Sequence, residues 1–66
     1  MSDLITAVQE EVARLREMIA TVKALAPNGR VNFFFYDMAI KEAERAIREQ
    51  DAIALVRILP ELKEME

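Results

Sequence analysis

The sequence contains neither cysteine nor histidine. Without cysteine no disulfide can form, and without both residues the usual ligands of structural zinc are missing. Histidine is also the most common general base, and the only serine and threonine hydroxyls are those of Ser2, Thr6 and Thr21. We therefore expect no catalytic residue, no metal site and no cofactor, and we predict that the chain is not an enzyme.

Glycine, proline and long apolar runs are also scarce. One Gly and two Pro leave few points at which a helix can be interrupted. No stretch reaches about 18 consecutive apolar residues, and the start at Met1 has no basic segment leading into an apolar run. We therefore expect a cytoplasmic protein with no membrane contact. The nine Lys and Arg are interleaved with twelve Asp and Glu, which makes nucleic acid an unfavourable partner.

A heptad pattern is the clearest feature that the sequence does contain. Residues are 53% hydrophobic and 32% charged, a mixture typical of folded helices. Apolar side chains recur at alternating spacings of four and three residues, at Met1, Ile5, Val8, Val12, Leu15, Ile19, Val22 and Ala26. The pattern predicts a helix over about 3–26, with Ser2 as its N-cap.

The next segment predicts a turn and a second helix. Pro27 cannot continue a helical hydrogen-bond ladder, and Asn28 and Gly29 tolerate left-handed backbone, so we place a turn at 27–31. A second helix follows over about 33–50, with Asn32 capping its first amides. Because the connection is short, the two helices should be antiparallel neighbours.

A third helix is predicted from the phase of the apolar residues. Extending the second helix beyond Ile47 would place Gln50 or Asp51 in the apolar face and turn the following leucines away by about 100°. A break at Gln50 and Asp51 avoids this, with Asp51 capping a helix over about 52–65 that is kinked or broken at Pro60.

These elements predict a single all-α domain over residues 1–66: an antiparallel helical hairpin plus a shorter third helix that self-associates into a helical bundle. So short a chain buries a small share of its surface, and neither disulfides nor metals can supplement its core. We therefore expect a homo-oligomer, with a twofold dimer favoured. The expected oligomer interface consists of Ile5, Val8, Val12, Leu15, Ile19, Val22, Leu55, Leu59 and Leu62.

The run Phe33, Phe34, Phe35 and Tyr36 is the most unusual feature. Four consecutive residues on a helix span about 300° and cannot all face one core. Three interpretations are open: the rings plug the end of the bundle under the turn, they form a binding site for another protein, or they stack on bases. The first is favoured, and the last would need surrounding basic residues, of which only Arg30 is near.

Charged residues of the second helix admit two interpretations. Arg30, Lys41, Arg45 and Arg48 could form a phosphate-binding face, but Glu42, Glu44 and Glu49 are interleaved with them. Asp37 with Lys41 and Glu44 with Arg48 have the four-residue spacing of ion pairs, so a solvated face is favoured. In the first helix, Glu11 lies beside the apolar seam, where we expect it to pair with an Arg of a neighbour.

Two functions are consistent with these patterns. The preferred one is a small, non-catalytic protein-interaction module, an oligomeric accessory or regulatory protein that acts by helix packing on an unidentified partner. The alternative is a small nucleic-acid-associated regulator in which dimerisation aligns two copies of the weak basic face.

Overall fold

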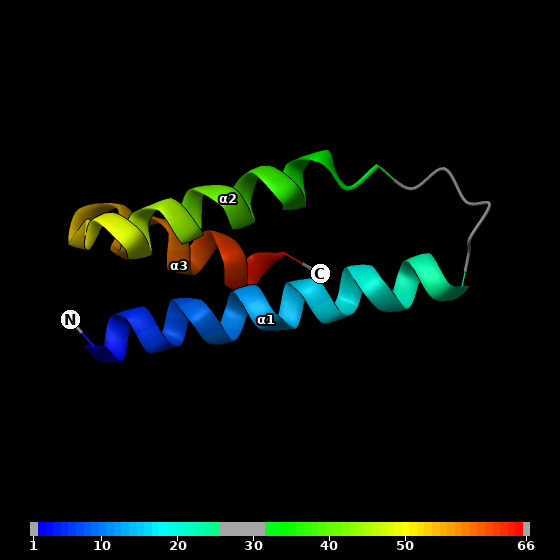
Figure 1. Cartoon of the computed structure of the whole chain (residues 1–66), viewed down its shortest axis with the longest axis horizontal. Helices are drawn as coiled ribbons and strands as arrows, with labels where there is room; N and C mark the ends of the chain where they lie inside the picture. The colour runs from blue at the N-terminus through cyan, green and yellow to red at the C-terminus, as the bar shows by residue number, and fades with distance from the viewer. Residues whose placement is uncertain (1, 26–31, 66) are drawn as a thin grey trace.

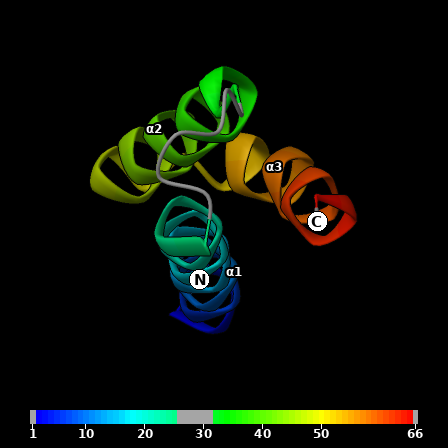
Figure 2. The ribbon, with the colours of Figure 1, turned by 90° about the vertical axis from the view of Figure 1, so that its right-hand side faces the viewer.

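The computed structural model describes residues 2–25 and 32–65, and its elements are three helices: α1 (Ser2–Leu25), α2 (Phe34–Glu49) and α3 (Ala52–Glu64). Figure 1 shows α1 and α2 running antiparallel, with α3 running back from the end of α2. Seen from the end in Figure 2, the helices stand at the corners of a triangle. The predicted all-α fold, a helical hairpin with a shorter third helix, is confirmed. The turn predicted at 27–31 lies outside the described residues.

The start of α2 depends on Asn32, as the sequence suggested, but the helix begins one residue later than expected. Asn32 Oδ1 accepts a hydrogen bond of 2.8 Å from the amide of Phe34. Phe33 precedes the first helical residue, and its carbonyl accepts a bond of 2.8 Å from the amide of Asp37. The side chain of Asn32 thus satisfies an amide that the first turn leaves without a helical partner.

The break between α2 and α3 is built by Gln50 and Asp51. Gln50 has left-handed backbone angles, φ 52° and ψ 41°. Its amide donates to the carbonyl of Ile47 at 3.2 Å, and the amide of Asp51 donates to the carbonyl of Ala46 at 2.9 Å. This paired arrangement is a Schellman motif, which closes a helix by satisfying its last carbonyls. Asp51 then caps α3, because its Oδ1 accepts from the amide of Ala54 at 3.1 Å.

Pro60 does not break α3. The helix runs through it to Glu64, and its end is marked by a bond of 3.2 Å from the amide of Met65 to the carbonyl of Leu62. Proline removes one backbone donor and leaves one carbonyl in the preceding turn without its helical partner. Of the kink or break expected at Pro60, the break is not seen, because α3 continues to Glu64.

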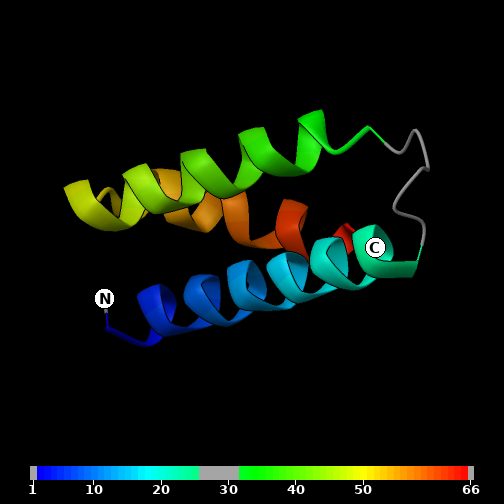
Figure 3. The ribbon, with the colours of Figure 1, turned by 45° about the vertical axis from the view of Figure 1, so that its right-hand side comes forward.

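Ten side chains form one core, contributed by all three helices. They are Val8, Val12, Leu15 and Ile19 of α1, Ile40, Ala43 and Ala46 of α2, and Leu55, Ile58 and Leu62 of α3. The two core alanines of α2 permit close approach, and α3 packs against both of the other helices. Figure 3 shows α3 running back from the end of α2, next to both of the other helices.

The same core contains most of the residues that the heptad pattern assigned to an interface between chains. Val8, Val12, Leu15, Ile19, Leu55 and Leu62 are buried within the single chain, and Ile5 and Leu59 pack at the edge of this core. Val22 is half-buried. A folded chain therefore does not present the six buried side chains, four of α1 with Leu55 and Leu62 of α3, to a second copy. Self-association stays a prediction, and it would use other surface.

Candidate interaction surfaces

The aromatic run is divided between the inside and the outside of the molecule. Phe33 and Tyr36 are partly buried and pack against the core. Their rings meet edge to face, with centroids 6.3 Å apart and an interplanar angle of 63°. The ammonium nitrogen of Lys23 lies 5.4 Å from the centroid of the Phe33 ring, within the range of a cation–π contact. These two rings close the end of the bundle at which α2 begins.

Phe34 and Phe35 face solvent instead. They are 57% and 72% exposed, and their rings also meet edge to face, with centroids 5.6 Å apart. Met38, one turn further along α2, is 53% exposed. Residues 34, 35 and 38 share one side of a helix, so they form a continuous surface, which we call the aromatic patch. Sequence reasoning identified both phenylalanines but missed Met38, although its spacing from Phe34 indicated the shared side.

A smaller apolar surface lies on the outside of α3. Ile53 and Val56 are 72% and 60% exposed, on the side of the helix opposite Leu55 and Leu62. Leu25, the last residue of α1, is also exposed. Ile53 was not singled out from the sequence, because both faces of this segment are rich in aliphatic residues.

The basic residues of α2 do not form a uniform basic face. Arg45 donates hydrogen bonds to Glu42 at 3.0 Å and to Glu49 at 3.1 Å. The bond with Glu42 and the negative charge of Glu49 raise the pKa of Arg45 above its usual value. Arg30 lies outside the described residues, while Lys41 and Arg48 are exposed. A phosphate would therefore compete with two carboxylates for Arg45, which weakens the case for nucleic acid.

Three expected ion pairs differ from those that the described residues form. Glu44 pairs with Arg16 of α1 and not with Arg48, and no ion pair joins Asp37 to Lys41. Glu11 pairs with Arg14 at 3.0 Å, three residues later in the same helix and not on a neighbour. For Glu11 the arginine one turn away is sufficient, because side chains three residues apart are neighbours on the helix surface.

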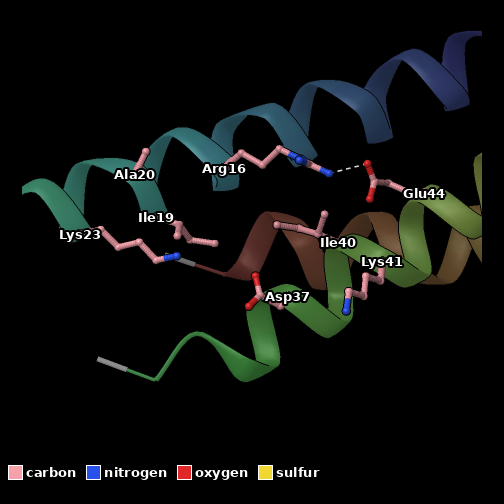
Figure 4. A pocket seen from close by; sticks show the side chains of 8 residues that line it. All are labelled: Arg16, Ile19, Ala20, Lys23, Asp37, Ile40, Lys41 and Glu44. Atoms are coloured by element: carbon pink, nitrogen blue, oxygen red, sulfur yellow. Dashed lines mark hydrogen bonds and ion pairs between the residues drawn. The ribbon is translucent and has the colours of Figure 1, made fainter. Parts of the chain in front are cut away.

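A groove runs between α1 and α2 on the side away from α3. It consists of two hollows of about 440 and 470 Å³, and the paired side chains of Arg16 and Glu44 line both of them. Figure 4 shows the first part, where the Arg16 side chain reaches across from α1 to meet Glu44 of α2. Ile19 and Ile40 form its apolar floor, and the second part has Val12 and Ile47 there.

The described core is apolar. Among the described residues no polar or charged side chain is buried, and no three acidic side chains gather as metal ligands. Over the part of the chain that the structure describes, the surface offers exposed apolar side chains on α1, α2 and α3, the α1–α2 groove, and a further hollow of about 540 Å³ between α2 and α3 that Arg45, Ile53 and Arg57 help to line.

None of the described helices combines the length and the apolar character needed to cross a membrane. Compared with known proteins, the chain matches no family model, no curated protein and no solved structure.

Proposed function

We propose that this chain is a small, non-catalytic protein-interaction module, a cytoplasmic accessory or regulatory protein that acts by packing a helix face on a partner. The observation that carries this proposal is the aromatic patch. Phe34, Phe35 and Met38 are each more than half exposed, although the chain has a closed core of its own. Exposed apolar side chains that lie side by side mark interaction surfaces more often than isolated ones do.

The composition of the patch supports the same conclusion. Aromatic residues and methionine are enriched in protein interfaces, where a large ring buries much area with few rotatable bonds to order. The edge-to-face contact between Phe34 and Phe35 holds the two rings in a defined arrangement before any partner arrives. A preformed surface loses less entropy on binding.

Oligomerisation belongs to the same proposal. The core residues of α1 are already covered by α2 and α3, so a homodimer would form through the aromatic patch. This surface contains three large apolar side chains, which alone suits a weak and reversible contact better than a permanent one.

Affinity capture from the source cell tests the proposal. The bait is the full chain, compared with a Phe34→Ala, Phe35→Ala double variant and with an Ile53→Ala, Val56→Ala double variant as a matched control on another helix. We expect a specific protein to be retained by the wild type and the α3 control but lost with the α2 double variant. Equal capture by all three baits would remove the aromatic patch from the interaction surface.

The alternative, a nucleic-acid-associated regulator, has a distinct outcome. Phosphate contacts weaken steeply as salt rises, whereas apolar packing holds. Binding that disappears when salt is raised from 50 to about 300 mM, and that is unaffected by the Phe34→Ala, Phe35→Ala change, would favour the alternative.

A further inference from the structure

We propose that the α1–α2 groove binds one helix of a partner protein, with an apolar face toward the groove and acidic side chains along both edges. The groove is separate from the aromatic patch, which lies on the outer face of α2. The inference rests on the proposed function only in that both describe a protein-binding chain. It adds a second surface and the chemistry of what that surface accepts.

The length of the groove's lining fits a helix. Its lining on α1 extends from Gln9 to Lys23, a span of roughly 20 Å at 1.5 Å per residue, which matches about four turns of a partner helix. Ala13 and Ala20 stand on the α1 wall, where small side chains let another backbone come close. A fourth helix here would occupy the side of the α1–α2 pair that α3 leaves open.

The floor supplies an apolar seam. Ile19 and Ile40 lie beneath one part of the groove, and Val12 and Ile47 beneath the other, as Figure 4 shows for the first pair. Val12, Ile19 and Ile40 are each 6 or 7% exposed, so they are nearly covered within the chain yet still border the groove. A partner with leucine or alanine along one face could complete this contact.

Charge selects the chemistry of the partner. Four basic side chains line the two parts of the groove, namely Arg16, Lys23, Lys41 and Arg48. Only Asp37 and Glu44 oppose them, so the groove carries a net +2 in a chain whose net charge is −3. A partner with acidic flanks would be attracted, and one with basic flanks repelled.

The basic side chains of the groove have hydrogen-bond donors available to bind such a partner. Lys41 and Arg48 make no ion pair with any residue that the structure describes, since Asp37 does not pair with Lys41 and Glu44 pairs with Arg16. Arg16 itself contacts Glu44 through Nη2, and a guanidinium has five N–H donors. A partner carboxylate could therefore join Arg16 without displacing Glu44.

The same charges argue against a second copy as the occupant. Two grooves facing each other across a twofold axis would bring two net positive surfaces together. The side chains that pack in the core are not available to enter the groove of a second copy, so a copy would have to present the aromatic patch or Ile53 and Val56. The occupant we infer is accordingly a helix of a different protein.

Peptide binding tests this directly. The probe is a fluorescent peptide of about 18 residues with leucine and alanine on one helical face and glutamate on both flanks, compared with a peptide in which lysine replaces every glutamate. We expect the acidic peptide to bind the wild-type chain at least about tenfold more tightly in fluorescence anisotropy. Equal affinity for the two peptides, or no binding of the acidic one at about 1 mM, would overturn the proposal.

Matched variants locate the contact. Lys41→Glu with Arg48→Glu should weaken binding of the acidic peptide by about tenfold or more, whereas Arg57→Glu with Lys63→Glu, the same charge change on α3, should weaken it less than about threefold. Ala20→Trp tests shape independently of charge, because it fills the wall of the groove at an exposed position. Equal losses in both charge variants would show nonspecific attraction and refute the site.

Three further readouts separate the competing explanations. Thermal unfolding of each variant establishes that loss of binding is not loss of fold. A shift in mass by analytical ultracentrifugation, caused by the groove variants alone, would make a second copy the occupant and reject our assignment. Tighter binding of a single-stranded RNA than of the acidic peptide would reject it as well. The Phe34→Ala, Phe35→Ala variant should bind the acidic peptide as tightly as the wild type does. The result of the peptide test is therefore independent of the test of the proposed function.

Discussion

Arg14 of α1 donates a hydrogen bond of 2.8 Å from Nη2 to the carbonyl oxygen of Leu62, 48 residues later at the end of α3. The same nitrogen donates to the carbonyl of Met65 at 3.0 Å, while Nε holds Glu11. The last carbonyls of a helix have no partners within it and carry partial negative charge, which a cation stabilises. One side chain therefore closes α3 and fixes it to α1.

Removing this guanidinium should destabilise the fold. We expect Arg14→Met, which keeps much of the aliphatic stem, to lower the free energy of unfolding by about 1 to 2 kcal/mol, because hydrogen bonds from a charged group are lost. The loss is limited because the Arg14 side chain is partly exposed. Arg14→Lys should have a free energy of unfolding between those of the wild type and Arg14→Met, since an ammonium cannot reproduce the planar arrangement of guanidinium donors. Urea unfolding followed by circular dichroism measures both. Arg57→Met, an exposed α3 position, is the control, and an equal loss there would contradict the role of Arg14.

Gln50 is the position at which a substitution should stabilise the chain. Its φ of 52° is unfavourable for a residue with a Cβ and costs roughly 1 kcal/mol or more, whereas glycine adopts this conformation freely. We expect Gln50→Gly to raise the free energy of unfolding by about 0.5 to 1 kcal/mol, and Gln50→Ala to give no such gain. Arg48→Gly, two residues earlier in helical backbone, should lower it by about 1 kcal/mol. Thermal melts of the three variants decide whether the left-handed position is the cause.

Asp51 should matter through its side-chain oxygen and not through its charge alone. Asp51→Ala removes the acceptor for the amide of Ala54 and should cost about 1 kcal/mol. Asp51→Asn and Asp51→Ser keep an acceptor and should retain most of the stability. If Asn proved as harmful as Ala, the cap would not be the reason that α3 begins here.

Much of the fold could be predicted because its signals are local. Asp51 shows this well: the phase of Ile47 against Leu55 required a break, and an aspartate stood where a helix cap was needed. The heptad pattern likewise identified Val8, Val12, Leu15 and Ile19 as buried. It could not tell whether the covering helices came from the same chain or from another, since both give one apolar stripe.

The remaining features depend on contacts between distant residues. Glu44 has a suitable arginine four residues later, yet it pairs with Arg16 of α1, and only the packing of the two helices decides between them. The bonds from Arg14 to the end of α3 join residues about fifty apart, for which no spacing rule exists. The groove was missed for the same reason, because its cations come from two helices and its identity as a site arises only when they pack.

Core and surface of α3 offer a direct comparison of two aliphatic residues. Leu55 is fully buried, while Ile53, two residues earlier, is 72% exposed. We expect Leu55→Ala to lower the free energy of unfolding by about 2 to 5 kcal/mol, a large share of the roughly 3 to 10 kcal/mol that a chain of this size has, and Ile53→Ala to lower it by under about 0.5 kcal/mol.

Leu15→Asp, which buries a carboxylate in α1, should prevent folding. A folded Leu15→Asp protein by circular dichroism would show that α1 is not the centre of the core.

The aromatic run provides the last comparison, in which stability and binding should separate. Phe33 packs on the core and beneath Lys23, so Phe33→Ala should lower the free energy of unfolding by about 1.5 to 3 kcal/mol. Phe34→Ala with Phe35→Ala removes two exposed rings and should change it by less than about 1 kcal/mol, most of which is their mutual contact. If the double variant unfolded as readily as Phe33→Ala, the outer rings would be part of the core. Their exposure would then no longer argue for a partner.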